Sequence, residues 1–232
     1  MKILGYSERG IINSLLFNIG GDKELMDEFI GLIKIPEIEK LKDSAKDYTV
    51  LLEQSFSRFG DADLVVIIHY EKPEDNKVLF IEGKVKTSNS SWNIQSQFKK
   101  YIEFKGDEKK IKPKNYWSNL FSQLYLKKLL IENWDKVKNI ESFVVKSDYV
   151  GERKIGTNKV VLAALEIIRC DKKNAYFVGL IPTRQKEFDK FHNKVDFEMS
   201  FLLWETVHDF CRKKEKLKDV LEIFKYNDRQ IY

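Results

Sequence analysis

Apolar residues at the start of the chain recur at the spacing of a helix. They follow one helix face behind Ser7, a candidate N-cap, until Gly20 and Gly21 end the pattern. These apolar residues are Ile11, Ile12, Leu15, Leu16 and Ile19. The pattern predicts a first helix between Ser7 and the two glycines, and a second, short helix over residues 22–33.

After these helices the apolar pattern changes to that of strands. Three strands are predicted, over residues 49–56, 64–70 and 78–85, and the polar segment 71–77 is expected to form a hairpin connection. The middle strand contains an unbroken apolar run, residues 64–68, which indicates a strand covered on both faces.

The remainder of the chain is predicted to mix helices and strands. Ser90 and Ser91 introduce a helix with an apolar stripe, and another helix is predicted over residues 116–132. The stripe consists of Ile94, Phe98, Tyr101 and Ile102. Further strands are predicted over residues 142–146, 160–169 and 175–181, and a last amphipathic helix over residues 196–214.

The pattern predicts a single α/β domain over residues 1–232, with a mixed central sheet flanked by helices and a C-terminal α+β extension. No repeat or linker rich in Pro, Gly or Ser divides the chain, and 43% hydrophobic content is enough for a core. No run approaches the roughly 18 apolar residues of a membrane span, and no signal peptide is recognisable. We therefore expect a soluble, cytoplasmic protein.

The net charge of +5 favours an anionic partner. Residues 97–114 hold seven lysines against three acids, a local balance of +4, and a second basic run spans residues 212–218. This Lys-rich segment is either a phosphate-contacting surface or a solvated face. Two cysteines and three histidines show no spacing typical of a metal cluster or a nucleophilic site.

Candidate chemistry lies at the ends of the second and third predicted strands. Acid-x-Lys triplets occur several times, but only Glu82 and Lys84 close an apolar strand, where both side chains share one face about 7 Å apart. Asp63 opens the preceding strand, so a hairpin would bring it to Glu82. Two adjacent carboxylates repel unless a proton or a cation intervenes, and oxygen ligands select Mg²⁺ or Mn²⁺. The alternative is a structural ion pair at a strand end.

At these residues the chain resembles the PD-(D/E)xK nuclease superfamily, whose restriction-endonuclease-like core is helix, three strands, helix, strand. The matching segments are Gly60-Asp61-Ala62-Asp63 and Ile81-Glu82-Gly83-Lys84. In addition, Gln97-Phe98-Lys99-Lys100-Tyr101 is similar to the Gln-x-x-x-Tyr motif of RecB-like exonucleases. The resemblance covers residues 8–101, so the catalytic core is expected within about the first 105 residues.

The resemblance implies a role for each matching residue. Asp63, Glu82, the Gly83 carbonyl and Glu8 would be metal ligands, although an acid at position 8 also complements a helix dipole. Lys84 would be the catalytic base or stabiliser, and Gln97 would orient the site. Two departures are that Ala62 stands where many members have Pro, and that Asp61 competes with Asp63 for the first-ligand role. Asp63 is preferred because it directly abuts the strand.

The sequence therefore favours a Mg²⁺-dependent nuclease acting on nucleic acid, with DNA favoured over RNA, in restriction, repair or defence. The residues expected to contact nucleic acid are Lys86, Lys99, Lys100, Tyr101 and Lys105, with core packing as the alternative for Tyr101. The protein could act as a homodimer or in a larger defence complex. The runner-up is a catalytically inactive nucleic-acid-binding or assembly subunit that retains the nuclease fold. A protein-interaction domain would require the motif residues to be dispersed.

Overall fold

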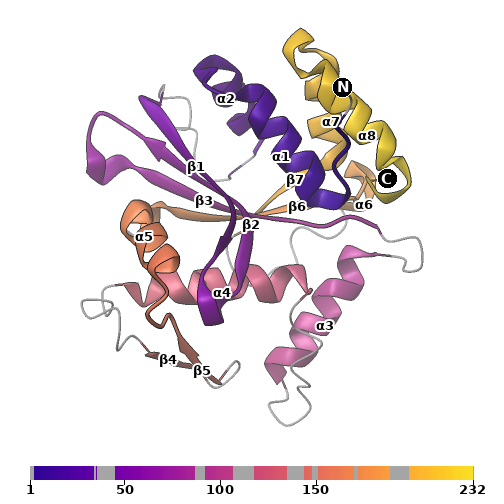
Figure 1. Cartoon of the computed structure of the whole chain (residues 1–232). Coiled ribbons are helices and arrows are strands. Elements are labelled where there is room, and N and C mark those ends of the chain that lie inside the picture. Colours follow the sequence, from indigo (N-terminus) through magenta and orange to yellow (C-terminus); the bar gives the residue numbers. More distant parts are fainter. Residues whose placement is uncertain are drawn as a thin grey trace.

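A five-stranded mixed sheet forms the centre of the computed structural model (Figure 1). Its strand order is β1-β2-β3-β6-β7. The strands are β1 (Asp47–Ser55), β2 (Asp61–His69), β3 (Lys77–Gly83), β6 (Ala175–Ile181) and β7 (Ser200–Leu203). The pairs β1–β2 and β2–β3 are antiparallel, whereas the pairs β3–β6 and β6–β7 are parallel. The predicted α/β class with a mixed central sheet is confirmed.

The structure describes most of the chain. The described ranges are residues 3–33, 35, 45–86, 92–106, 118–134, 144–147, 151–169, 172–188 and 199–231. The segment 87–91, with Ser90 and Ser91, and most of the Lys-rich segment lie outside them. Within the described residues, no helix is long and apolar enough to cross a membrane.

Helices cover both faces of the sheet (Figure 1). One face packs against α1 (Ser7–Ile19), α2 (Lys23–Ile30), α7 (Trp204–Arg212) and α8 (Lys218–Tyr226). The other packs against α3 (Ile94–Gly106), α4 (Leu120–Glu132) and α5 (Lys159–Ile168). The middle strand β2 supplies Val66 to the first layer and Val65 to the second, and both are 0% exposed. Its continuous apolar run is therefore explained by burial on both sides.

The predicted strand over residues 160–169 is wrong, because this segment is helix α5. The side chain of Asn158 caps the helix by accepting hydrogen bonds from the N–H groups of residues 160 and 161. Its buried residues have the spacing of a helix face: Val161, Ala164, Leu165 and Ile168. The β-branched residues favour a strand locally, but burying this single stripe against the sheet decides for the helix.

The C-terminal part differs most from the prediction. The expected helix over residues 196–214 divides into the short parallel strand β7 and helix α7, and α8 and α9 (Asp228–Ile231) follow. The strand β4 (Val144–Ser147) agrees with the prediction, and it pairs with an unpredicted β5 (Gly151–Lys154) in a separate two-stranded sheet. Another short helix is α6 (Gln185–Phe188). Short apolar segments fit helix and strand equally, so β7 depends on pairing with β6.

Ser7 is not the N-cap of α1. Tyr6 occupies the cap position without a side-chain bond, and Ser7 is the first helical residue. The Ser7 N–H donates to Oδ1 of Asn227 at 2.9 Å, and Asn227 also donates to the carbonyl of Gly5 at 2.9 Å. The buried side-chain amide of Asn227, near the other end of the sequence, therefore accepts the hydrogen bond of an N–H group that has no partner within the helix.

Candidate active site

The pairing of β2 with β3 brings Asp63 and Glu82 together. The register places Leu64 opposite Ile81, so the next residues outward are Asp63 and Glu82. Asp63 is 6% exposed and Glu82 is 2% exposed. Oδ2 of Asp63 accepts a hydrogen bond from the Gly83 N–H at 2.8 Å. The two carboxylates are thus held at one end of the sheet and shielded from water.

Burial, together with the adjacent charge of Glu82, raises the pKa of Asp63 to about 6. Lys84, the Gly83 N–H and Arg9 oppose this shift without cancelling it. Asp61 is exposed, whereas Asp63 is buried beside Glu82. This geometry favours Asp63 over Asp61 as the residue that acts with Glu82.

Lys84 links Glu82 to helix α4. Its Nζ lies 2.8 Å from Oε1 of Glu82 and donates to Oε1 of Gln123 at 2.6 Å. Burial disfavours its charged form, but the carboxylates of Glu82 and Asp63 outweigh burial and raise the pKa of Lys84 above its usual value. Lys84 is therefore an ammonium in this arrangement.

The backbone of Lys84 is held from two sides. Its N–H donates to the carbonyl of Leu180 in β6 at 2.8 Å. Its carbonyl accepts from Nε1 of Trp204, the first residue of α7, also at 2.8 Å. Strand β6 and helix α7, which sequence reasoning did not connect with the site, thereby position the acid-x-Lys strand end.

Helix α4 contributes two polar residues that sequence reasoning missed. Gln123 contacts Lys84, and one turn later Lys127 is 0% exposed and donates to the carbonyl of Asp61. Burial lowers the pKa of Lys127. The available signal was their four-residue spacing inside a helix rich in leucine, which places both side chains on one face.

The N-terminal turn of α1 lies beside the carboxylates. A Cβ at Gly83 would lie 2.9 Å from Cβ of Glu8 and 3.4 Å from Oδ2 of Asp63, so a larger residue would push α1 away. The carboxylate of Glu8 also helps to raise the pKa of Lys84. Nε of Arg9 lies 3.4 Å from Oδ1 of Asp63. The Cβ and Cγ atoms of Glu8 therefore lie beside Gly83, next to the two buried carboxylates.

One carboxylate oxygen of the site, Oε2 of Glu82, is buried and has no hydrogen-bond partner among the described residues, which is unusual for a carboxylate oxygen. A cation bound between Glu82 and Asp63 fits this observation, because it would satisfy Oε2 and remove the repulsion between the carboxylates. The chemistry of these donors suits Mg²⁺ or Mn²⁺.

The three-carboxylate set is not assembled in this structure. Within the described ranges, no group of three or more His, Cys, Asp or Glu side chains is arranged to hold a metal ion. The two buried carboxylates are paired with cationic side chains instead, Glu82 with Lys84 and Asp63 with Arg9. Glu8 approaches Gly83 but does not complete a third carboxylate ligand.

The Gln-x-x-x-Tyr segment has a structural role in the described contacts. Oε1 of Gln97 accepts from the Leu120 N–H at 3.2 Å, and the Gln97 carbonyl accepts from Nδ2 of Asn119 at 2.7 Å. Gln97 thus holds the start of α4, whose Gln123 makes the contact with Lys84. The nucleic-acid contact predicted for Tyr101 is wrong, because this residue is 0% exposed and packs against Phe121 in the core.

The predicted basic surface is described only in part. Lys99 and Lys100 are exposed on α3. Lys86 is half-buried, and its N–H donates to the carbonyl of Gln230. The side chain of Lys105 and the lysines of residues 107–117 lie outside the described residues.

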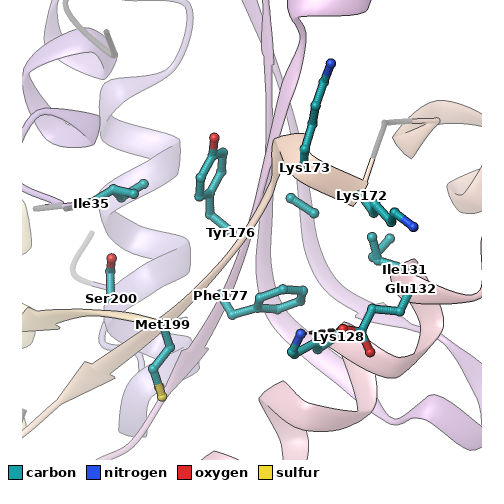
Figure 2. A pocket seen from close by; sticks show the side chains of 11 residues that line it. Ile35, Lys128, Ile131, Glu132, Lys172, Lys173, Tyr176, Phe177, Met199 and Ser200 are labelled. Atoms are coloured by element: carbon teal, nitrogen blue, oxygen red, sulfur yellow. Dashed lines mark hydrogen bonds and ion pairs between the residues drawn. The ribbon is translucent and has the colours of Figure 1, made fainter. Parts of the chain in front are cut away.

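A separate hollow of about 260 Å³ lies beside the first residues of β6 and β7 (Figure 2). Phe177 and Met199 line it, and Lys128 and Glu132 form an ion pair at its edge. Neither Glu82 nor Lys84 belongs to this hollow, because both lie where β3 ends. The carboxylate pair is therefore defined by its contacts and not by this cavity.

The raised pKa of Asp63 predicts how the stability of the metal-free protein depends on pH. The folded state holds the proton of the Asp63 carboxyl more tightly than the unfolded state does. The stabilisation that this proton gives is complete below about pH 4 and is lost as pH rises through about 6. The expected loss by neutral pH is about 3 kcal/mol in the free energy of unfolding. In Asp63→Asn this part of the pH dependence should be absent.

Urea unfolding in EDTA at several pH values between 4 and 8 measures this effect. The difference in stability between wild type and Asp63→Asn isolates the titration of Asp63, since the remaining groups are common to both proteins. A difference that stays constant across this range would show that Asp63 is ionised throughout.

Comparison with known proteins adds nothing to this geometry. The chain matches no protein-family model, and it matches no curated protein and no solved structure. The assignment of the site therefore depends on the contacts of this chain's own residues.

Proposed function

We propose that the chain is a Mg²⁺- or Mn²⁺-dependent nuclease that hydrolyses phosphodiester bonds of DNA. The observation that carries the proposal is the buried pair Asp63 and Glu82. Lys84 contacts one oxygen of Glu82, and the other oxygen has no partner among the described residues. Burying two carboxylates side by side is costly without a compensating cation. A catalytic centre gives a reason for retaining this arrangement.

The topology supports a restriction-endonuclease-like core. Helix α1 precedes the antiparallel strands β1, β2 and β3, and the next strand of the central sheet, β6, runs parallel to β3. This order corresponds to the helix, three strands, helix, strand expected from the sequence, with α3 and α4 in the place of the second helix. The candidate residues lie where β2 begins and β3 ends.

The residues present fit a single hard cation. Asp63, Glu82 and the carbonyl of Gly83 would hold it, with water as the remaining ligand. When bound, such an ion polarises a phosphodiester and lowers the pKa of a water molecule. Gly83 keeps the space between α1 and Asp63 narrow, because it has no side chain.

Lys84 acts as a stabiliser and not as a base in this proposal. In the metal-free protein its raised pKa keeps it an ammonium, which donates hydrogen bonds and cannot accept a proton. The ammonium would balance charge that develops on the phosphate oxygens in the transition state. Oε1 of Gln123 accepts a hydrogen bond from the ammonium of Lys84 and so limits the directions in which Lys84 points.

The exposed lysines of α3 supply a site for the DNA backbone. Lys99 and Lys100 lie on the helix that Gln97 connects to the start of α4. Contacts of this kind give affinity without sequence preference. Restriction, repair or defence remains the proposed cellular role, with a homodimer or a larger complex as the proposed assembly.

One observation favours the runner-up, a binding or assembly subunit without activity. Lys84 and Arg9 already neutralise the two buried carboxylates, and the described residues hold no ready group of three metal ligands. An inactive descendant of a nuclease would keep such internal ion pairs for stability.

Purified wild-type protein incubated with linear duplex DNA, single-stranded DNA and RNA separates the two functions. We expect cleavage of DNA in Mg²⁺ or Mn²⁺ and none in EDTA, because the metal is required for the chemical step. Binding to these substrates without cleavage in either metal would make the inactive subunit the better account. Preferential cleavage of RNA would keep the nuclease and change its substrate.

A further inference from the structure

Lys127 is a buried lysine that the proposed chemistry does not use. It is 0% exposed, in the middle of α4, and its ammonium donates to the carbonyl of Asp61. Lysine is almost never fully buried unless it is paired, since removing an ammonium from water is costly. A leucine would fit an apolar helix at lower cost, so the ammonium requires an explanation.

The contacts of Lys127 lie at the turn that leads into β2. Gly60 has a left-handed φ of 78°, and a Cβ there would lie 3.2 Å from Nζ of Lys127. The turn therefore passes directly over the ammonium. Asp61 opens β2, and Asp63 follows two residues later on the same side of the strand.

We propose that Lys127 is a positioning residue that fixes the start of β2, so that Asp63 meets the Gly83 N–H and faces Glu82. The chain of contacts is short: Lys127 to the Asp61 carbonyl, then two residues of strand, then Oδ2 of Asp63 to the Gly83 N–H. The proposal relies on the proposed function only in taking Asp63 as a metal ligand.

The surroundings of Lys127 fit the same role. Lys127 is buried close to Asp63, Glu82 and Lys84. Burial lowers the pKa of Lys127, and the carboxylates of Glu82 and Asp63 oppose this shift without cancelling it. Its contact with the Asp61 carbonyl needs only an N–H donor, so the positioning role follows from this hydrogen bond.

Lys127→Met in the full chain, with Lys128→Met as the matched control, tests this role. Both variants remove one ammonium from α4, but Lys128 pairs with Glu132 and contacts none of the proposed site. Amide hydrogen exchange without metal is the first measurement. In Lys127→Met the Gly83 N–H should exchange about tenfold faster than in wild type. This factor corresponds to the loss of about one hydrogen bond. Amides in the middle of β2 should not change.

The second measurement is Mn²⁺ affinity by calorimetry. Lys127→Met should bind Mn²⁺ roughly 10- to 100-fold more weakly, as expected when a group that orients a metal ligand is lost. Lys128→Met should bind like wild type. Tighter binding in Lys127→Met would mean that Lys127 only opposes the cation, and equal acceleration of all amides would mean a general role in stability. Either result overturns the proposal.

Two further outcomes are covered by the same design. If Lys127→Met does not fold, Lys127→Gln, which keeps an N–H donor on a shorter side chain, enters the same exchange comparison. If wild type binds no Mn²⁺, the proposed nuclease fails, but the exchange of the Gly83 N–H still decides whether Lys127 positions Asp63. Unchanged Gly83 exchange in the folded variant contradicts the positioning role whatever the metal does.

Discussion

Replacing Lys84 by alanine is expected to lower the rate of Mg²⁺-dependent DNA cleavage by about 100-fold or more. The ammonium lies beside Glu82 and Gln123. In the proposed nuclease it would balance the charge of the transition state, while the carboxylates would hold the metal. DNA affinity should change little, because in this proposal it would arise from surface lysines. The loss should therefore appear in kcat and not in the dissociation constant.

Lys46→Ala is a suitable control for this measurement. Lys46 is an exposed lysine whose Nζ lies 3.5 Å from a carboxylate oxygen of Glu71. Replacing it by alanine removes the same charge from the protein as Lys84→Ala does. Circular dichroism of each variant, with and without Mg²⁺, verifies that both are folded, which matters because Lys84→Ala leaves the buried Glu82 without its cationic partner. Cleavage by Lys84→Ala at the wild-type rate would show that the site assignment is wrong.

Replacing Glu82 by glutamine is expected to weaken Mn²⁺ binding by more than about 100-fold, because a charged ligand is lost and not only a residue that orients one. The substitution keeps the size of the side chain, so packing against the neighbouring residues of β3 is retained. Oε2 of Glu82 has no other partner among the described residues, which makes it the oxygen most available to a cation. Titration calorimetry measures the affinity directly.

Glu53→Gln is the matched control for Glu82→Gln. Glu53 is a nearby but exposed carboxylate whose Oε2 contacts Arg9 at 3.4 Å and does not belong to the proposed ligand set. Its loss should leave Mn²⁺ affinity within a few-fold of wild type. If Glu82→Gln and wild type bind Mn²⁺ equally, Glu82 is not a ligand, and the buried pair is a structural ion-pair cluster.

Local sequence patterns were sufficient to predict strands β2 and β3, which border the candidate site. The continuous apolar run of β2 predicted a strand buried on both faces, and the apolar strand ending in Glu82 predicted an acid and a lysine on one face. Period-two alternation and hairpin pairing are local properties, so they also brought Asp63 opposite Glu82. A strand was wrongly predicted over residues 160–169, where the structure has helix α5, because β-branched residues are locally ambiguous.

The partners of these residues required the tertiary structure. Motif spacing pointed to Gln97, but the fold presents Gln123 to Lys84 and uses Gln97 to hold the start of α4. Lys127 belongs to no recognisable sequence motif, because its hydrogen-bond partner is a backbone carbonyl 66 residues earlier in the chain.

By itself the sequence determined the α/β class, the β2 and β3 strands and the acidic and basic residues at their ends, because these follow from short-range periodicity. Tertiary packing decided that residues 160–169 form a helix, that Tyr101 belongs to the core, and that α4 brings Gln123 to Lys84. The physical reason is that burial and hydrogen-bond partners of a side chain depend on which distant segments pack against it. Period and propensity describe only its neighbours along the chain.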